Sequence, residues 1–557
     1  MSCEFMVVSQ FFRTGINKRF YITCSANVFI IALASYYCLV INIPFMQGAF
    51  TAITTLPAFS WLFLLSVPLL LLCLLIIFFS LLSSRWLLKP VSYILLLCSC
   101  AALYGTLNYG VVFDYSMIQN TFETDSQEAV SYLNPQFMLF FTLFALLPLL
   151  ILIKTNVRFS PVTQELLSRS KLVLGCLALI AVIVLSFYAD YAATGRNNQL
   201  LKKELIPFQY LSSGYKYLRD QWLVTKEPFK ILDPTPTLIT PAQTQVTVIV
   251  VGETARAANF AYQGYARDTN RYSRPFNVTY MNNVASCGTA TAVSVPCMFS
   301  QQQHTNFSRS EADNQQNILD IAATAGVDVL WIDNNSGCKN VCNRITTLTP
   351  DDSLCTQQPC YDEALLAPLR RKLANLSQAN TVIVLHMMGS HGPTYFQRYP
   401  DDFRLFTPTC DRSDIQNCTN EQLVNTYDNS IAYSDYVNSQ VLQQLSELPN
   451  SIDKNFIYVS DHGESLGENG AYLHGFPYSF APAEQTHVPL YIWVGKNNQR
   501  ISQNCLRSLD SQPAYSHDIL FHTLSNFIGL KTSTYEAQLD LLNTCNTLNN
   551  KAVSNHE

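Results

Sequence analysis

The stretch QVTVIVVGETAR, residues 245–256, decides the fold of the C-terminal half of the chain. Its run Val246–Val251 is apolar and rich in β-branched residues, as is typical of a strand buried on both faces of a sheet. The run ends at Gly252 and is followed by a carboxylate, Glu253. Ligands of parallel sheets gather at the carboxyl ends of the strands, so Glu253 is a candidate functional residue.

Similar apolar runs follow along the chain at Val327–Asn334, Thr381–Pro393 and Asn455–Gly470. Helix-like stretches alternate with them, at Asn317–Ala325, Glu363–Leu376 and Glu421–Leu448. This alternation predicts an α/β domain with a largely parallel sheet. Three further polar residues are expected at the same sheet edge as Glu253, namely His391, Asp461 and His462.

The N-terminal half contains five apolar stretches of about 20 residues, the length needed to cross a membrane as a helix. They are Tyr21–Ile43, Trp61–Leu82, Val91–Phe113, Phe137–Ile153 and Leu172–Ala189. Lys and Arg precede the first stretch and occupy every second connection, which indicates a cytoplasmic N-terminus. Because five is odd, the chain after residue 189 is expected on the outer side.

The cysteines support an outer, oxidising location for the C-terminal half. Of 17 cysteines, an even number lies there, mostly in close pairs, which favours disulfides between neighbours. A zinc ribbon would need paired C-x-x-C knuckles, and this sequence has none. The ten outer cysteines are Cys287, Cys297, Cys338, Cys342, Cys355, Cys360, Cys410, Cys418, Cys505 and Cys545.

We therefore predict three parts in the 557-residue chain. Residues 1–189 form a five-span transmembrane domain, and residues 190–245 form interfacial helices and a linker. Residues 246–557 form the outer α/β domain. The net charge of −5 gives no basic footprint for binding nucleic acid.

A zinc site follows from the adjacent Asp461 and His462, since carboxylate and imidazole are zinc ligands. Glu253 would be a third ligand, although a lone Glu after a strand is more often a capping or surface residue. The fourth position suits a hydroxyl from the loop SCGTATAVSVPC, residues 286–297, because a metal acidifies a hydroxyl nucleophile. Residue chemistry alone leaves both Thr289 and Thr291 as candidates.

Five motifs together carry a family resemblance: VVGETARAANFAYQGYARDTNRY, SCGTATAVSVPCMFS, DNNSGCK, GSHGPTY and SDHGESLGENGAYLHG. With them the chain resembles the lipid A phosphoethanolamine transferases, which include the mobile colistin-resistance enzymes. The family belongs to the alkaline phosphatase–sulfatase superfamily. The resemblance implies a multi-pass protein of the bacterial inner membrane, with five transmembrane α-helices and a periplasmic α/β/α sandwich domain.

The resemblance also implies roles for individual residues. Thr291 would be the nucleophile, and zinc would be held by Glu253, Thr291, Asp461 and His462. His391 and His474 would contact the transferred phosphate or a second zinc. The substrate pocket would include Asn335, Lys339, His386 and Glu464, and the donor headgroup would meet Asn120, Thr124 and Glu128. The last three are spaced i, i+4 and i+8, so we expect them on one helical face.

The implied activity is zinc-dependent transfer of phosphoethanolamine from phosphatidylethanolamine to a lipid A phosphate through a covalent intermediate on Thr291. The product would be less negatively charged, which would weaken the binding of cationic peptides such as polymyxin and colistin. We expect a monomer with no nucleic-acid partner. Alternatives are transfer of phosphoethanolamine or phosphoglycerol to another envelope acceptor, simple hydrolysis, and a non-catalytic membrane sensor on the same scaffold.

Overall fold

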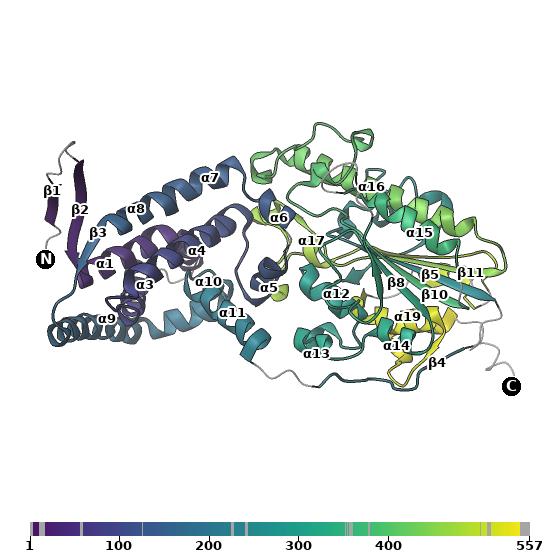
Figure 1. Cartoon of the computed structure of the whole chain (residues 1–557), viewed down its shortest axis with the longest axis horizontal. Helices are drawn as coiled ribbons and strands as arrows, with labels where there is room; N and C mark the ends of the chain where they lie inside the picture. The colour runs from purple at the N-terminus through teal and green to yellow at the C-terminus, as the bar shows by residue number, and fades with distance from the viewer. Residues whose placement is uncertain are drawn as a thin grey trace. The chain divides into compact units, whose positions relative to one another are not determined.

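The computed structural model describes residues 4–10, 17–55, 60–124, 126–223, 228–239, 243–350, 353, 355, 360–376, 379–498, 500–501, 503–509 and 514–545 (Figure 1). These residues form two compact units. The first comprises Met1–Tyr115 and Leu133–Lys216, and the second comprises Ser116–Tyr132 and Tyr217–Glu557. The predicted boundary at residue 189 lies inside a helix of the first unit, and the predicted three-part division stays a prediction.

The second unit is built on a seven-stranded sheet of order β6-β14-β11-β5-β10-β8-β9. Strands β11, β5, β10, β8 and β9 run parallel, and β14 pairs antiparallel with both β11 and β6. The strands are β5 (Thr244–Gly252), β6 (Thr279–Met281), β8 (Asp328–Asp333), β9 (Thr346–Leu348), β10 (Asn380–His386), β11 (Ile452–Ser460) and β14 (Leu490–Val494). The predicted α/β fold with a largely parallel sheet is confirmed.

Two predicted strands extend past the ends of the strands in the structure. Strand β10 ends at His386 rather than Pro393, and β11 ends at Ser460 rather than Gly470. The residues after each end leave the sheet as loops, and these loops carry His391, Asp461, His462 and Glu464. Polar loop residues adjoin the apolar strand residues in sequence, so hydropathy alone does not mark the boundary.

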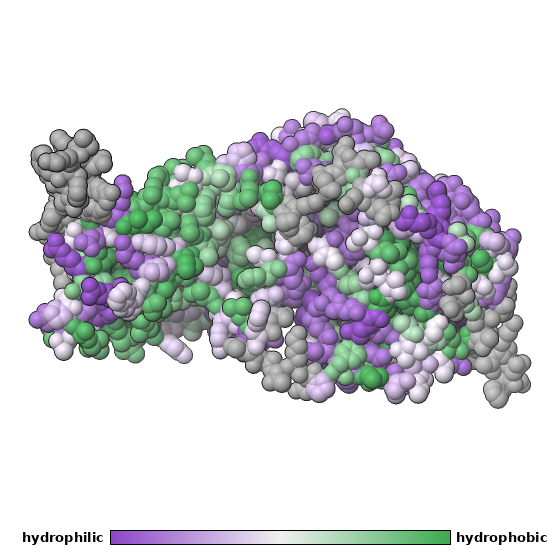
Figure 2. Space-filling view, viewed as in Figure 1, coloured by the Kyte–Doolittle hydropathy of each residue, from purple (hydrophilic) through white to green (hydrophobic). Residues whose placement is uncertain are grey.

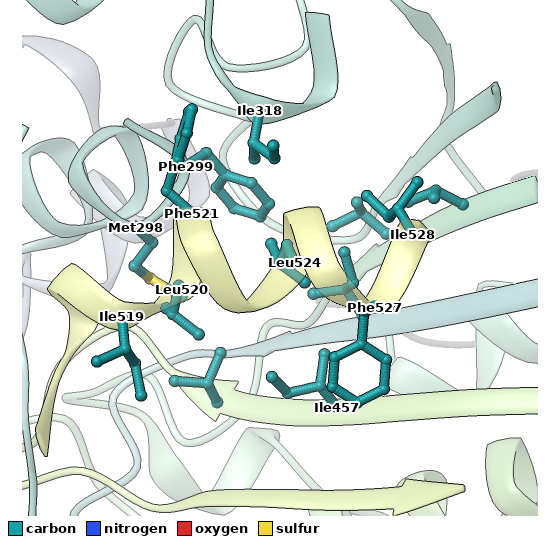
Figure 3. Packing of buried hydrophobic residues seen from close by; sticks show 14 of the residues in the cluster. Met298, Phe299, Ile318, Ile457, Ile519, Leu520, Phe521, Leu524, Phe527 and Ile528 are labelled. Atoms are coloured by element: carbon teal, nitrogen blue, oxygen red, sulfur yellow. The ribbon is translucent and has the colours of Figure 1, made fainter. Parts of the chain in front are cut away.

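Helices cover both faces of this sheet (Figure 1). Helices α15 (Leu366–Leu373) and α16 (Asn420–Ser446) lie on one face, and α12 (Thr291–Phe299), α14 (Ile318–Thr324) and α19 (Leu520–Ile528) lie on the other. In Figure 3, α19 places Leu524 and Phe527 toward Ile457 of β11, while Phe521 packs near Phe299 of α12. This buried cluster fixes α12, and with it Thr291, relative to the sheet.

The first unit consists mainly of apolar helices. Its longer elements are α1 (Ala26–Tyr36), α2 (Ile43–Thr54), α3 (Trp61–Leu81), α4 (Leu88–Tyr109), α7 (Pro135–Phe141), α8 (Leu147–Lys154), α9 (Val162–Asn197) and α11 (Phe208–Leu218). Four helical spans of the described chain, at Trp61–Leu81, Leu88–Tyr109, Pro135–Lys154 and Val162–Asn197, are long and apolar enough to cross a membrane. Hydrophobic side chains cover the exposed surface of α7 and α8 (Figure 2).

The predicted first span is not one straight helix. Residues Asn17–Ser25 form strand β2, and the helical pair Ala26–Ile41 and Ile43–Thr54 bends by 62°. Asn42 stands at the bend, where its Nδ2 donates to the carbonyls of Tyr37 and Ile206 at 3.0 and 2.6 Å. The described residues thus contain four candidate spans, or five if the bent pair counts as one.

All five neighbouring cysteine pairs of the C-terminal half form disulfides, as predicted. They are Cys287–Cys297, Cys338–Cys342, Cys355–Cys360, Cys410–Cys418 and Cys505–Cys545. Four of the bridges close loops of ten residues or fewer, and Cys505–Cys545 closes one of 40.

Candidate metal centre

Two neighbouring parallel strands deliver the three predicted ligands. Gly252 pairs with Ser460 at the carboxyl ends of β5 and β11, so Glu253 and the pair Asp461-His462 emerge side by side. All three side chains are fully buried. One ligand atom from each lies within 4.8 Å of the other two. A buried imidazole and two buried carboxylates in contact match the donor set of a zinc site.

Asp461 and His462 each use one polar side-chain atom in hydrogen bonds within the protein. Asp461 Oδ1 accepts from the backbone N–H groups of Thr254 and His462 at 3.1 and 2.7 Å. His462 Nδ1 lies 2.9 Å from the Gly463 carbonyl, which places its proton there and leaves a lone pair on Nε2. Asp461 Oδ2 is buried without a hydrogen-bond partner among the described residues and lies 3.3 Å from that Nε2. An orphaned carboxylate oxygen facing an imidazole lone pair fits a cation between them.

Glu253 is held from two sides. Thr254 Oγ1 donates to Oε1 at 2.6 Å, and Asn335 Nδ2 donates to Oε2 at 2.8 Å. Asn335 also donates to the Met387 carbonyl at 2.8 Å, so its amide is itself fixed. Thr254 has φ +58°, a strained conformation of the kind found at functional sites. Gly389 is required nearby, because a Cβ there would lie 2.6 Å from the Glu253 carbonyl oxygen.

The structure separates the two candidate threonines. Thr291 is the first residue of α12, and its Oγ1 lies 3.1 and 3.2 Å from the Glu253 carboxylate oxygens and 3.3 Å from His462 Nε2. Thr289 Oγ1 instead donates to the Phe476 carbonyl at 2.5 Å. Thr291 Oγ1 therefore adjoins the candidate ligands Glu253 and His462, whereas Thr289 Oγ1 is used in a structural hydrogen bond.

His517, which sequence reasoning missed, connects the loop at residues 286–297 to the end of strand β11. Its Nδ1 accepts from the Cys287 N–H at 3.1 Å, and its Nε2 donates to the Ser460 carbonyl at 3.0 Å. Ser294 Oγ contacts both His517 Nδ1, at 3.3 Å, and the Asp461 carbonyl. Cys287, whose N–H belongs to this network, is also bridged to Cys297. Nothing in the local sequence YSHDIL marks His517, because its partners lie far away in the chain.

The electrostatics of the centre reflect three charged groups in one buried place. Burial disfavours the charge of Glu253, but a hydrogen bond to His462 and its charge hold the pKa of Glu253 well below the usual range. Burial and the charge of Glu253 raise the pKa of Asp461 to about 7. Burial opposes the cation of His462, yet Asp461 and Glu253 raise its pKa to about 10, so without a metal the Nε2 lone pair also takes up a proton, which a bound cation would displace. The two carboxylates thus concentrate negative charge that a divalent cation would neutralise.

Two further histidines stand beside the centre. The ring of His474 lies 4.5 Å from that of His462 and 5.2 Å from that of His391, between centroids. His474 Nδ1 contacts Glu464 Oε2 at 2.9 Å, and Tyr395, which sequence reasoning missed, donates its hydroxyl to the other oxygen of Glu464. Burial lowers the pKa of both His391 and His474 to about 3, so both are neutral at pH 7. Each ring then offers one N–H donor and one acceptor.

The other predicted pocket residues are distributed more widely. His386 is buried with Nδ1 3.0 Å from Asp333 Oδ2, and its Nε2 has no partner among the described residues. Lys339 Nζ contacts Ser336 Oγ at 2.9 Å and the carbonyl of Glu123 at 3.3 Å. Among the described contacts, Lys339 thus faces the segment Ser116–Tyr132.

The expectation of one helical face for Asn120, Thr124 and Glu128 is wrong. Helix α5 (Tyr115–Glu123) ends before Thr124, and α6 begins at Ser126 and extends to Ser131. Thr124 Oγ1 donates to the Asn120 carbonyl at 2.7 Å. The side chain of Glu128 lies outside the described residues. The sequence TDS at residues 124–126 was a usable signal, because such residues commonly precede a helix start.

Comparisons with known proteins agree with this geometry. A family model described as "Phosphoethanolamine transferase EptA/EptB" matches residues 71–222, and the model "Sulfatase" matches residues 245–530. Phosphoethanolamine transferase EptA of Escherichia coli K12 is 40% identical over 526 residues, covering 92% of this chain and 95% of its own. Phosphatidylethanolamine transferase Mcr-1 of E. coli is 34% identical, with 83% and 87% covered.

A solved structure shows the same architecture over the full chain. It is the integral membrane protein lipooligosaccharide phosphoethanolamine transferase A (EptA) from Neisseria meningitidis. The match has a TM-score of 0.90 and 33% identity, and it covers 94% of this chain and 99% of the other. The chain therefore belongs to the EptA/EptB family of phosphoethanolamine transferases, integral membrane enzymes whose catalytic part has a sulfatase-like fold.

Proposed function

We propose that the protein transfers phosphoethanolamine from phosphatidylethanolamine to a lipid A phosphate, with Thr291 as the covalent nucleophile. The observation that carries the proposal is the position of Thr291 Oγ1, which touches Glu253 and His462 at 3.1–3.3 Å. The relatives named EptA and Mcr-1 support the transferred group. The protein would act in the bacterial inner membrane with its catalytic domain in the periplasm, where disulfides form.

Glu253, Asp461 and His462 would hold one zinc ion together with Thr291, and a second zinc near His391 and His474 remains a separate proposal. When bound, zinc supplies Lewis-acid stabilisation of the attacking oxygen and of charge on the phosphoryl oxygens. The fit rests on Asp461 Oδ2, which has no hydrogen-bond partner among the described residues, and on His462 Nε2, which faces it at 3.3 Å.

The protein's own residues account for two displacements. Thr291 Oγ gives up its proton to water and bonds to the phosphorus of the donor, while the bond from phosphorus to the glycerol oxygen breaks. The glycerol oxygen takes up a proton from water, and diacylglycerol leaves. A lipid A phosphate oxygen then bonds to the same phosphorus, the bond from phosphorus to Thr291 Oγ breaks, and Oγ regains a proton from water. His391 and His474 would contact the transferred phosphate, and His386, Asn335, Lys339 and Glu464 would complete the pocket around it.

The proposed product predicts a phenotype. Each transferred group adds an ammonium to lipid A, so the outer surface carries less negative charge. Binding of cationic peptides such as polymyxin and colistin would weaken, which is resistance.

Mass spectrometry tests the proposal directly. Lipid A from cells that express the wild type should gain phosphoethanolamine, and Thr291→Ala should abolish the gain because the attacking atom is gone. Thr289→Ala is the matched control, since it removes only a hydrogen bond to Phe476, worth about 1 kcal/mol of stability. A peptide containing phosphoethanolamine on Thr291 should accumulate when acceptor is withheld.

Three outcomes would overturn parts of this account. Full lipid A modification by Thr291→Ala would move the nucleophile elsewhere. Unmodified lipid A together with a Thr291 adduct would mean that the acceptor is another envelope molecule, such as an inner-core sugar. Active protein without zinc by elemental analysis would remove the metal from the mechanism.

A further inference from the structure

Arg309 contacts four segments of the second unit, which contains the candidate metal centre. It begins the short helix α13 (Arg309–Asp313), and its side chain is only 9% exposed. Nε donates to Asp313 Oδ1 at 2.9 Å, Nη2 donates to the Lys339 carbonyl at 3.2 Å, and Nη1 donates to the Ala292 carbonyl. Nη1 also lies 3.7 Å from Glu123 Oε2. One buried guanidinium therefore connects α13, the Cys338–Cys342 loop, α12 and α5.

The bond to Ala292 fills a gap that the sequence creates. Ala292 follows Thr291 in the first turn of α12, where its carbonyl would ordinarily accept from the N–H four residues later. That residue is Pro296, which has no N–H. Arg309 supplies the missing donor and so fixes the backbone directly beside the nucleophile.

The opposite side of Arg309 faces α5. Glu123 is the last residue of α5, and its Oε1 accepts from Gln119 Nε2 at 2.8 Å. Its Oε2 is buried, has no hydrogen-bond partner among the described residues, and faces the Arg309 guanidinium. The Glu123 carbonyl accepts from Lys339 Nζ, whose own carbonyl accepts from Arg309. Glu123, Lys339 and Arg309 thus form one charged network.

We propose that Arg309 is a positioning residue that couples α5 to Thr291. This inference rests on the proposed function and on the prediction from the family resemblance that Asn120 of α5 and Thr124, which follows α5, meet the donor headgroup. Donor bound there would shift or stiffen α5, and the Glu123–Arg309 pair would transmit the change to the Ala292 carbonyl. Thr291 would then be aligned for attack when a lipid donor is in place. A misplacement of about 1 Å can cost roughly 100-fold in rate, so a small shift suffices.

Kinetics with two donors test the coupling in the full-length, zinc-loaded protein. One donor is phosphatidylethanolamine in vesicles with lipid A, and the other is a water-soluble nitrophenyl ester of phosphoethanolamine that does not need α5. Glu123→Gln should lower kcat about 10-fold for the vesicle donor, leave KM unchanged, and spare the soluble ester. Arg309→Gln should lower kcat for both donors, because Ala292 loses its partner.

The double variant Glu123→Gln/Arg309→Gln tests whether Glu123 acts through Arg309. If Glu123 acts through Arg309, the double variant should have the same vesicle-donor kcat as Arg309→Gln alone. Arg309→Lys, which keeps the charge but not the forked contacts, should restore part of the rate. Arg344→Gln is a matched control, since it removes another arginine–carboxylate pair, with Asp320 at 2.6 Å, away from α12.

Multiplicative losses in the double variant, or wild-type kcat in Arg309→Gln, would overturn the inference. The inference would also be overturned if the fall in kcat of Arg309→Gln equalled its loss of bound zinc or of folded protein and Arg309→Lys did not restore the rate. Failure of the proposed function looks different. In that case the wild type itself forms no adduct on Thr291 and transfers nothing from either donor.

Discussion

Single side chains in the metal centre differ in how many of their polar atoms the protein already uses. Asp461 keeps one oxygen for backbone N–H groups and one for the centre, and Glu253 has a separate donor on each oxygen. Such outer contacts orient ligands and commonly change metal affinity 10- to 100-fold. Asn335, which follows β8, contacts the Glu253 carboxylate from a neighbouring strand end.

Removing the Asn335 amide should therefore weaken metal binding without removing a ligand. For Asn335→Ala we expect zinc affinity to fall about 10-fold or more, because Glu253 Oε2 loses its donor. Competition with a chelator of known affinity measures the change. Asn343→Ala is the control, since this exposed residue bonds only Asn340 among the described contacts. Equal zinc affinity in both variants would mean that Thr254 alone orients Glu253.

His517 gives a pH dependence whose sign is fixed by burial. Burial lowers its pKa from 6.5 to about 3 in the folded protein. Between pH 6.5 and pH 3 the unfolded chain therefore binds a proton at His517 and the folded protein does not. The contribution of neutral His517 to the free energy of unfolding is consequently full above pH 6.5 and decreases as the pH falls toward 3. His517→Gln keeps one donor and one acceptor but does not titrate. Its melting temperature should fall less than that of the wild type between pH 7.5 and 4.5, and equal falls would contradict this role.

At the scale of elements, α12 is held by a disulfide at one turn and by α19 along its side. The Cys287–Cys297 bridge spans the loop that carries both Thr289 and Thr291. The Cys410–Cys418 bridge closes a loop of similar length but lies outside the ligand set. Comparing these two bridges separates general stabilisation from positioning of the nucleophile.

Double replacement of either pair by alanine should cost about 2–4 kcal/mol of stability, since short loops of similar length are released. Only Cys287→Ala/Cys297→Ala should also lower kcat, by about 10-fold or more, because Thr291 would move relative to Glu253. Chemical unfolding measures the first effect, and turnover per zinc-loaded protein measures the second. Equal kcat in both double variants would show that α19 and His517 position the loop without the bridge.

The elements also show what the sequence could predict. Runs of β-branched residues located β5, β8, β10 and β11, and neighbouring cysteines predicted all five bridges. Residue chemistry proposed Glu253, Asp461 and His462, but the choice of Thr291 over Thr289 needed the resemblance and then the geometry. His517, Tyr395 and Arg309 could not be predicted, because each acts through partners brought close only by the fold. The bend at Asn42 likewise depends on Ile206.

On the scale of the whole molecule, the catalytic unit is not continuous in sequence. Residues Ser116–Tyr132 group with Tyr217–Glu557, although apolar helices precede and follow them in the chain. Every proposed zinc ligand and all five disulfides lie after residue 217. The proposed headgroup residues do not. Folding of the catalytic centre and access to the lipid donor are thus assigned to different parts of the chain.

A chain reduced to residues 217–557 separates these two properties. It should fold, bind zinc and form its disulfides, because the sheet, α12, α19 and the ligands are all present. It should cleave the water-soluble phosphoethanolamine ester within about 10-fold of the full-length rate, since Arg309 still reaches Ala292. Transfer from phosphatidylethanolamine vesicles should fall far more, because Asn120, Thr124 and the membrane helices are missing. The ratio of the two rates, each normalised to zinc content, is the quantity to measure. An unchanged ratio would mean that neither the α5 segment nor the membrane unit presents the donor, whereas a truncated chain without zinc would place part of the metal centre's support in the removed residues.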